Sequence, residues 1–371
     1  MAHIGIDASR MAWARRTGTE QYTAHLVEAL TRLETYHHLT LYFNRLPSPP
    51  PAWPEQVQVR TMPFPRLWTH LRLSWEMARR PPDLLFVPAH VLPLWRPRRS
   101  VATIHDLGYL FFPQAHPRRR RLELHLSTAW NARVATRVIA VSRATRDDLV
   151  RIYRVPAERV EVVYHGVEER FHPQEDPAAL ARYHLPERYF LYLGTLQPRK
   201  NLERLLEAYA HLPAGAPTLV LAGARGWYYQ RIAATIASLE LERRVLLPGY
   251  ISDQDVPAVL GAATALVYPS LYEGFGLPAL EAMACGTPVI ASRASSLPEV
   301  VGEAGLLVDP LNVEEIAAAM QRLLDDPALG QELRRQGLEQ ARRFTWERCA
   351  RETMMVLEKA LEVGTFERSN V

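Results

Sequence analysis

Two glutamates, Glu273 and Glu281, stand eight positions apart in the segment ALVYPSLYEGFGLPALEAMACGTPV, residues 265–289. The pattern of apolar residues predicts a short strand over 265–268, a turn, and a helix over 277–284. Glu273 then lies on the loop before the helix, and Glu281 lies one turn into it. From this loop, the Glu273 side chain can reach into a cleft.

The loop between the two glutamates is suited to an anion. Gly274 and Gly276 let a ligand approach the backbone closely. Pro278 falls in the first turn of the predicted helix, where its missing N–H costs little. We expect the backbone N–H groups of Phe275, Gly276 and Leu277 to face the anion, because a helix N-terminus attracts negative charge.

A second anion site is predicted in the sequence GTLQPRKN, residues 194–201. It joins a predicted strand over 189–193 to a predicted helix over 202–211. Arg199 and Lys200 stand at this strand-to-helix turn. A helix N-terminus and two cationic side chains bind phosphate together.

A histidine and an aspartate, His105 and Asp106, follow a predicted strand over 100–104. Polar residues at the carboxyl end of a parallel strand point into the ligand crevice of an α/β domain. A lone histidine is normally structural. Asp106 has three readings, since it can orient His105, cap the next turn, or contact an acceptor.

Two other classes of site fit parts of this pattern. Paired carboxylates also serve in glycosidases, and a spacing across a loop–helix junction does not fix their separation. Gly274, Gly276 and Ala279 fit the dinucleotide pattern G-x-G-x-x-A. The segment is not the first strand–helix unit of the chain, however, so a nicotinamide enzyme is a minor alternative.

The sequence around these residues resembles that of a known family. The text Y-E-G-F-G-L-P-x-L-E-A-M-A-C-G-T-P-V-I is similar to the E-x7-E signature of retaining glycosyltransferases of family 4, which are glycogen-synthase-like and have the GT-B fold. T-I-H-D-L, residues 103–107, resembles the acceptor-domain signature of mannosyltransferase-like members. The resemblance extends over essentially the whole chain, and it is densest over 189–310 and loosest over 8–100.

The resemblance implies an α/β fold of two Rossmann-like domains that face a cleft. Residues 1–168 would form the acceptor-binding domain, and 169–345 would bind the nucleotide sugar. A final helix around 346–371 would cross back to the first domain. At 371 residues, with 48% hydrophobic content, the chain is long enough for two such domains.

The resemblance also implies a role for each site residue on the donor side. Glu273 would hydrogen-bond the donor sugar, Glu281 the ribose, and Lys200 the donor phosphates. Thr195 occupies the position of a family arginine, and this chain has Arg199 next to Lys200, so Arg199 replaces the missing arginine or points away. The backbone of Tyr250 and Ile251 would hold the base.

The same comparison assigns three residues to the first domain. His105 would lie beside the donor sugar, which makes His105, Lys200 and Glu273 the candidate catalytic residues. Gly18 would be the remnant of a glycine-rich loop that approaches the donor diphosphate; its alternative is a simple turn glycine. Asp106 is a weak candidate for the acceptor. No metal ligands and no cofactor are expected.

Charge is distributed unevenly along the chain. Residues 1–170 hold 25 arginines and 15 acidic residues, a balance of +10, and the remaining residues carry −6. A basic half suggests an anionic partner. HPRRRR at 116–121 is a solvated face or a site for lipid phosphate. The predicted helix over 67–79 contains Trp68 and Trp75, and either lies at a membrane interface or packs into the core, which we favour.

Other partners and locations are bounded by composition. Two cysteines, Cys285 and Cys349, indicate neither a disulfide framework nor a metal site, as expected in a reducing cytoplasm. The chain opens directly on a predicted strand, with no signal peptide, and no apolar run approaches 18 residues. We therefore expect a cytoplasmic protein, at most peripheral on the inner face of the membrane, and no nucleic-acid partner.

The family resemblance, taken with these features, implies a metal-independent, retaining hexosyltransferase. Mannose from GDP-mannose is the favoured donor, and the acceptor is a glycan, a lipid-linked sugar or a polyol. A UDP-sugar enzyme of the same fold stays open. So do an enzyme of different reaction, such as an epimerase or a phosphorylase, and a catalytically silent partner that binds nucleotide or membrane in polysaccharide assembly.

Overall fold

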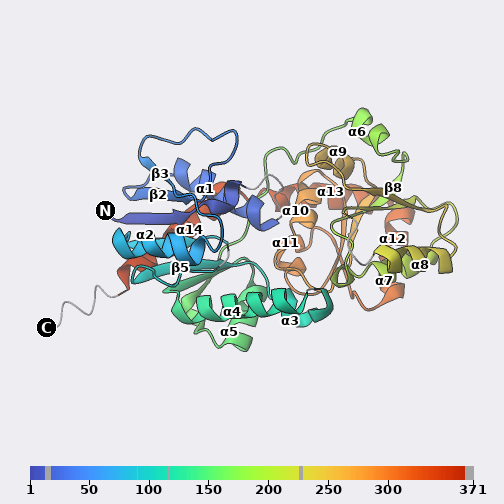
Figure 1. Ribbon diagram of the computed structural model, residues 1–371. Coiled ribbons are helices and arrows are strands. Elements are labelled where there is room, and N and C mark those ends of the chain that lie inside the picture. Colours follow the sequence, from blue (N-terminus) through green and yellow to red (C-terminus); the bar gives the residue numbers. More distant parts are fainter. Residues whose placement is uncertain (13–17, 90, 116, 225–228, 364–371) are drawn as a thin grey trace. The chain divides into compact units, whose positions relative to one another are not determined.

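The computed structural model describes residues 1–12, 18–89, 91–115, 117–224 and 229–363 (Figure 1). The chain divides into two compact units. Unit 1 comprises residues 1–110, 116–166 and 345–371, and unit 2 comprises 111–115 and 167–344. The predicted domain boundaries were 168/169 and 345/346.

Unit 1 is built on a seven-stranded parallel sheet in the order β3-β2-β1-β4-β5-β6-β7. The strand order reverses between β1 and β4, which opens a crevice at their carboxyl ends. The strands are β1 (His3–Asp7), β2 (His38–Phe43), β3 (Val57–Thr61), β4 (Leu84–Val87), β5 (Arg99–Ile104), β6 (Arg137–Ala140) and β7 (Val160–Val162).

Helices cover both faces of this sheet, because its strands are apolar on both sides. In β4, Leu84 and Phe86 pack into one core, and Leu85 and Val87 pack into the other. The helical segments are η1 (Ser9–Ala12), α1 (Gly18–Arg32), η2 (Thr69–Leu73), α2 (Ser74–Arg79), α3 (Gly108–Phe111), α4 (Arg118–Val134), α5 (Arg143–Tyr153), η4 (Ala157–Arg159) and α14 (Trp346–Glu362).

The last helix, α14, belongs to unit 1 although 178 residues of unit 2 precede it in the chain. It packs beside α1 on one face of the sheet, at the red end of the colour scale in Figure 1. The segments η2, α2, α4 and α5 cover the opposite face. Ser142 accepts a hydrogen bond from the Thr145 amide at the start of α5, so the predicted N-cap is confirmed.

Unit 2 repeats the plan with a six-stranded parallel sheet, ordered β10-β9-β8-β11-β12-β13. Its switch point lies between β8 and β11. The strands are β8 (Tyr189–Leu193), β9 (Thr218–Ala222), β10 (Val245–Gly249), β11 (Ala265–Tyr268), β12 (Val289–Ser292) and β13 (Leu306–Val308).

Helical segments precede, connect and follow the strands of unit 2. They are η3 (Pro113–Ala115), α6 (Pro177–Arg182), η5 (Pro198–Lys200), α7 (Leu202–Ala210), α8 (Tyr229–Ser238), α9 (Val256–Gly261), α10 (Leu277–Ala284), α11 (Leu297–Val301), α12 (Val313–Asp325) and α13 (Pro327–Ala341). Segments η5 and α7 to α11 lie between successive strands of unit 2, whereas η3 comes from the separate stretch 111–115, α6 precedes β8, and α12 and α13 follow β13. Among the described residues, no helix is long and apolar enough to cross a bilayer.

Two local predictions are corrected. The helix expected over 253–262 begins only at Val256, and Ser252 does not cap it, because the Ser252 hydroxyl donates to the Asp255 carboxylate at 2.7 Å. The helix expected over 67–79 begins at Thr69 with a π-helical turn. Trp68 is buried as favoured, but Trp75 is exposed.

Candidate functional site

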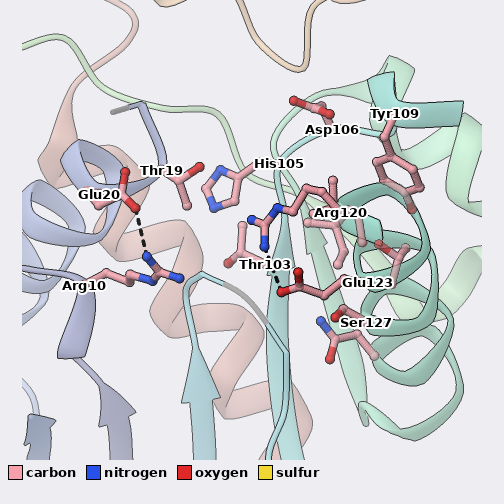
Figure 2. A pocket seen from close by; sticks show the side chains of 14 residues that line it. Arg10, Thr19, Glu20, Thr103, His105, Asp106, Tyr109, Arg120, Glu123 and Ser127 are labelled. Carbon is pink, nitrogen blue, oxygen red and sulfur yellow. Dashed lines mark hydrogen bonds and ion pairs between the residues drawn. The ribbon is translucent and has the colours of Figure 1, made fainter. Parts of the chain in front are cut away.

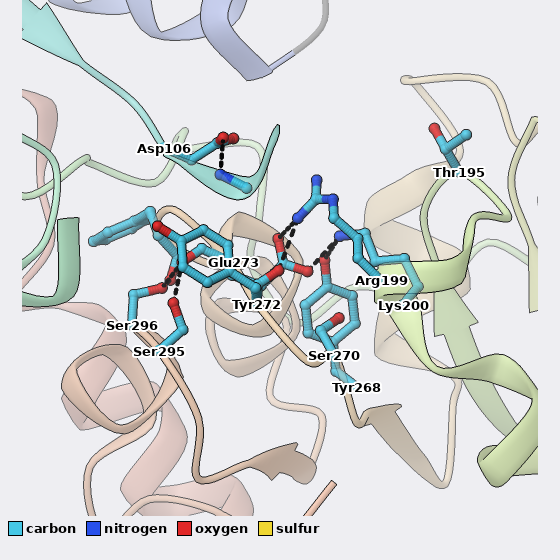
Figure 3. Close-up of polar contacts among 12 residues, drawn as sticks. Asp106, Thr195, Arg199, Lys200, Tyr268, Ser270, Tyr272, Glu273, Ser295 and Ser296 are labelled. Atoms are coloured by element: carbon cyan, nitrogen blue, oxygen red, sulfur yellow. Dashed lines mark hydrogen bonds and ion pairs between the residues drawn. The ribbon is translucent and has the colours of Figure 1, made fainter. Parts of the chain in front are cut away.

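The switch point of unit 2 brings two loops together: residues 194–201 after β8 and residues 269–276 after β11. Their side chains meet at Glu273 (Figure 3). Lys200 Nζ lies 2.5 Å from Glu273 Oε1, and Arg199 Nη1 lies 3.0 Å from Glu273 Oε2. Both oxygens of one carboxylate therefore pair with a cation.

This ion cluster is buried. Lys200 is 5% exposed and Glu273 6%. Burial by itself would raise the pKa of Glu273, but the adjacent Lys200 and Arg199 lower that pKa to about 2. The carboxylate stays ionised, and two cations facing one anion leave an excess of positive charge at the end of the sheet.

Further hydrogen bonds orient the cluster. Lys200 Nζ also donates to the Tyr268 hydroxyl at 2.5 Å, and Arg199 Nη1 donates to the Tyr272 carbonyl oxygen at 2.8 Å. Burial raises the pKa of Tyr268 well above its usual value, so the hydroxyl stays protonated. Apolar periodicity alone placed Tyr268 in a strand, and its contact with Lys200 was not predicted.

The turn before α10 is held from the opposite side. The hydroxyls of Ser295 and Ser296 donate to the Glu273 carbonyl oxygen at 2.6 and 3.0 Å, and Ser296 also donates to the Phe275 carbonyl oxygen at 2.8 Å. Gly276 adopts φ +109° as the N-cap of α10. The predicted loop residues 273–276 thus lead directly into the N-terminus of the helix.

Glu281 occupies the second turn of α10, in different surroundings from Glu273. Burial raises the pKa of Glu281 to about 7, with Arg170 opposing the shift and Glu168 and Asp253 adding to it. Arg170 binds Glu168 through two nitrogens, each 2.9 Å from an oxygen. Near neutral pH, Glu281 is therefore able both to accept and to donate hydrogen bonds.

The remaining donor residues of unit 2 take separate positions. Ile251 is buried, whereas Tyr250 is exposed and its hydroxyl donates to Asp253 Oδ1 at 2.7 Å. Thr195 lies apart from the Glu273 carboxylate in Figure 3, and Arg199 reaches it instead.

Unit 1 contains a cavity of about 330 Å³ at the carboxyl ends of its strands (Figure 2). His105 and Asp106 line it, so two predicted residues come together there. The other lining residues are Arg10, Thr19, Glu20, Thr103, Ile104, Tyr109, Arg120, Glu123, Leu124, Ser127, Thr128 and Asn131. Sequence reasoning missed most of these, because they come from helices without a recognisable motif.

His105 is neutral in this cavity. Its Nε2 lies 2.9 Å from the Pro88 carbonyl oxygen, which only accepts hydrogen bonds, so Nε2 carries the proton and Nδ1 does not. Burial lowers the pKa of His105, in spite of the Pro88 contact and the nearby Asp106. An unprotonated imidazole nitrogen is a hydrogen-bond acceptor for a ligand hydroxyl.

Two ion pairs stand at the sides of the cavity (Figure 2). Arg10 Nη1 lies 3.2 Å from Glu20 Oε1, and Arg120 Nη1 lies 2.7 Å from Glu123 Oε1. With these pairs the cavity offers both donors and acceptors, which suits a ligand with several hydroxyl groups.

Asp106 and Gly18 have local structural roles. Asp106 Oδ1 accepts a hydrogen bond from the Gly108 amide at 2.9 Å, so the carboxylate caps the start of α3 while lining the cavity. Gly18 is the first residue of α1, next to the cavity residue Thr19. Residues 13–17 of this loop and His116 of the arginine run lie outside the described residues.

Among the described residues, no group of three or more histidine, cysteine, aspartate or glutamate side chains is arranged to hold a metal ion. The two cysteines are unpaired and buried.

Comparison with known proteins assigns the chain to a family. A model described as glycosyl transferases group 1 matches residues 177–344, and one described as glycosyltransferase family 4 matches residues 16–171. The O-antigen chain mannosyltransferase B of Escherichia coli is 36% identical over 297 residues, which cover 78% of this chain and 77% of that protein. The chain belongs to glycosyltransferase family 4.

Other relatives agree with this assignment. The MMP alpha-(1->4)-mannosyltransferase of Mycolicibacterium hassiacum is 37% identical over 245 residues. The matched region covers 62% of this chain and 56% of that protein. The solved structure of sucrose-phosphate synthase from Thermosynechococcus elongatus matches with a TM-score of 0.74 at 25% identity, over 97% of this chain and 99% of the other. The glycosyltransferase therefore has the α/β GT-B fold, as predicted.

Family membership removes the nicotinamide alternative for the glycines of residues 274–279. In this glycosyltransferase they belong to the turn between β11 and α10, the fourth strand–helix unit of unit 2. The roles of the individual site residues stay predictions.

Proposed function

We propose that this glycosyltransferase is a retaining, metal-independent mannosyltransferase that uses GDP-mannose. The observation that carries the proposal is the buried cluster of Lys200, Arg199 and Glu273 beside the N-terminus of α10. Its excess positive charge suits a departing diphosphate. The mannosyltransferase relatives support the choice of sugar.

In this proposal, unit 2 binds the donor. Lys200 and Arg199 neutralise the leaving diphosphate, and the amides near Gly276 add hydrogen bonds. Glu273 holds the hydroxyls of the sugar and Glu281 those of the ribose, while the backbone at 250–251 holds the base. The sugar–phosphate bond breaks, the acceptor oxygen bonds to the same face of the anomeric carbon, and the leaving phosphate takes the proton of that oxygen.

The acceptor is assigned to the cavity of unit 1. Its ion pairs and its hydroxyl-bearing residues suit a polyhydroxylated acceptor, such as a glycan, a lipid-linked sugar or a polyol. His105, which also lines the cavity, is assigned to the donor sugar, and its unprotonated Nδ1 would accept a hydrogen bond from a sugar hydroxyl. We also propose that the protein is cytoplasmic and works at the inner face of the membrane. The basic character of residues 1–170 supports a lipid-linked acceptor.

A UDP-sugar is the second candidate donor, because base contacts through the backbone at residues 250–251 do not by themselves select guanine. A panel of GDP, UDP, ADP, dTDP and their sugars separates the two by thermal shift, since a ligand that binds the native state raises the melting midpoint. A shift with GDP and GDP-mannose alone supports the proposal. A shift with UDP compounds overturns the donor but keeps the fold.

A catalytically silent binding partner makes a different prediction in the same assay series. It would bind nucleotide without releasing sugar, whereas an enzyme hydrolyses its donor slowly in the absence of acceptor. Absence of donor hydrolysis and of transfer would overturn the enzymatic assignment.

Chelation tests the metal-independent mechanism. Because Arg199 and Lys200 supply the positive charge, we expect unchanged turnover after dialysis against EDTA, measured as GDP released from GDP-mannose. Loss of activity that added Mg²⁺ or Mn²⁺ restores would contradict this mechanism.

A further inference from the structure

One helical segment on the surface of unit 1 has apolar side chains on two opposite sides. The continuous helical segment formed by η2 and α2, residues 69–79, packs into the core with one side, where Trp68, Leu73 and Met77 are buried. The Trp68 indole donates to the Met62 carbonyl oxygen at 2.8 Å. The segment therefore contributes to the core of unit 1 with this side only.

The other side of the same segment is also apolar, and it is exposed. Leu67, Leu71 and Trp75 are exposed, with Trp75 at 56%. The loop between β4 and β5 adds two more exposed side chains, Leu94 and Trp95, and Trp95 is 69% exposed. The Trp95 amide donates to the Ser74 hydroxyl at 3.3 Å, which fastens the loop beside the start of α2. We call these five side chains the Trp75–Trp95 surface.

Helix α4 continues the surface beyond this loop. The Trp130 indole donates to the Leu92 carbonyl oxygen at 3.0 Å, and the Arg96 guanidinium lies 5.2 Å from the Trp130 ring centroid. Leu122 and Leu126 stand two turns and one turn before Trp130 on α4, and both are exposed. The exposed apolar side chains thus lie on adjoining elements.

Arginine dominates the charge of these elements. Residues 61–80, 91–99 and 118–134 together contain twelve arginines and two glutamates. Of the two acids, Glu76 is buried and pairs with Arg60 at 2.7 Å and with Arg72 at 3.1 Å. Glu123 pairs with Arg120. The Arg79 guanidinium lies 5.5 Å from the Trp75 ring centroid, so a cationic side chain stands directly beside the exposed indole.

The backbone at the start of the surface is strained. Leu67 has φ +54°, a left-handed conformation that a bulky residue rarely adopts, and its side chain is exposed. Such strain persists where the surrounding structure enforces it and is concentrated at functional segments. Leu67 is 66% exposed and is not among the described side chains that form the two cores of unit 1.

We propose that the Trp75–Trp95 surface binds an anionic lipid bilayer, with tryptophan and leucine at the headgroup boundary and arginines on the lipid phosphates. Tryptophan concentrates at that boundary, and basic side chains beside it add attraction to anionic lipids. A second copy of the chain fits less well, because a two-fold contact would bring arginines against arginines. This inference deepens the membrane location proposed above and does not depend on donor or acceptor.

Vesicle sedimentation with the full chain tests the proposal. We expect the protein to sediment with vesicles of phosphatidylcholine and phosphatidylglycerol, and much less with phosphatidylcholine alone. The double variant Trp75→Ser/Trp95→Ser should lose about tenfold or more in affinity for the anionic vesicles. The variant Arg79→Gln/Arg80→Gln should bind more weakly and with a smaller dependence on salt.

Matched controls come from the opposite face of the sheet. Tyr36, exposed at 64%, follows α1, and Arg32 ends it. Tyr36→Ser and Arg32→Gln should sediment like the native chain. Melting midpoints equal to the native value show that each variant is folded.

Three results would overturn the proposal. The native chain could stay in the supernatant with both vesicle types. The tryptophan double variant could sediment as well as the native chain. The lipid-free protein could also be a dimer that the double variant dissociates, which would make the surface an interface between copies. Since none of these measures sugar transfer, they leave the proposed enzymatic activity untouched.

Discussion

At the scale of single residues, Lys200 has an unusual environment for a lysine. It is one of two lysines in the chain and is almost fully buried. A buried ammonium group is costly unless it is paired and hydrogen-bonded. Glu273 and Tyr268 provide both at 2.5 Å. Arg199 then adds a second cation, and this surplus is the basis for assigning a diphosphate to the site.

The orientation of Arg199 could not be predicted from its neighbours in the sequence. Two consecutive side chains reach the same carboxylate because η5 is a 3-10 turn, and Asn201 follows it at φ +62°. The Asn201 amide donates to the carbonyl oxygens of Pro269 and Pro310 at 3.1 and 2.6 Å. These bonds span 68 and 109 positions, so they depend on the tertiary fold.

Glu281 gives a prediction for pH. Its pKa is about 7 in the free protein, and ribose hydroxyls that donate to the carboxylate would lower it in the complex. Nucleotide binding then releases a proton. The Kd for GDP-mannose, whose doubly esterified diphosphate has no group that titrates near neutral pH, should rise as pH falls through 7, by up to about tenfold per pH unit, until the lower pKa of the complex is reached. Calorimetric titration at several pH values measures this.

In the matched variant Glu281→Gln, the side chain cannot titrate. Its Kd should therefore be higher than that of the native chain and nearly constant between pH 6 and about 8. A native Kd that stays constant over this range would remove Glu281 from the ribose site. An identical slope in both proteins would assign the titration to another group.

At the scale of elements, α10 and its preceding turn depend on Gly276. An added Cβ would lie 2.6 Å from Leu297 Cδ2, and the residue has φ +109°. Gly276→Ala should therefore destabilise unit 2 by about 1–3 kcal/mol in urea unfolding. It should also weaken GDP binding, because the turn carries Glu273.

Gly330 provides the control for this substitution. It lies in α13 with open space around the site of an added Cβ. Gly330→Ala should raise stability by about 0.5–1 kcal/mol, since glycine is the poorer helix former. Equal effects of the two substitutions would show that the turn at Gly276 tolerates a side chain.

Elements were more predictable from the sequence than their caps and exposed faces. The strand Ala265–Tyr268 and the helix Leu277–Ala284 have the predicted bounds, since apolar runs and the Gly–Pro punctuation mark both. Ser252 was assigned as a cap because serine favours that position, but a competing carboxylate three residues later takes its hydroxyl. Trp75 was expected in the core because helical spacing does not reveal which face is covered.

At the scale of the whole molecule, unit 1 is completed by the last described helix of the chain. In α14, Leu357 is fully buried against the core of unit 1, whereas Met355, two residues earlier, is 56% exposed. Leu357→Ala should destabilise unit 1 by about 2–5 kcal/mol, and Met355→Ala should change stability by less than about 0.5 kcal/mol.

Thermal or urea unfolding followed by tryptophan fluorescence measures both variants, since Trp346 begins the same helix. The GDP affinity proposed for unit 2 provides a second readout, which Leu357→Ala should leave close to native while the protein is folded. Equal stability of the two variants would contradict the contribution of α14 to the core of unit 1.

The division into two α/β units followed from the family resemblance and from the restart of strand–helix alternation at Tyr189. Of the cavity in unit 1, only His105 and Asp106 were predicted, because the rest of its lining comes mainly from η1, α1, α3 and α4, which the sequence does not connect. Arg10 and Asn131, for example, are 121 positions apart. Only the parallel sheet brings these elements to one edge.

The most direct test of the account is a calorimetric titration of GDP-mannose into the native chain, Lys200→Ala and Lys359→Ala. Lys359 is the other lysine of the chain and pairs with Glu161 at 3.0 Å on the surface of unit 1. We predict binding to the native chain, equal binding to Lys359→Ala, and a loss of about 30-fold or more in Lys200→Ala, as expected for a charge-assisted phosphate contact. Equal affinity of all three proteins, or no binding to the native chain, would contradict the assignment of the Lys200–Arg199–Glu273 cluster to the donor diphosphate.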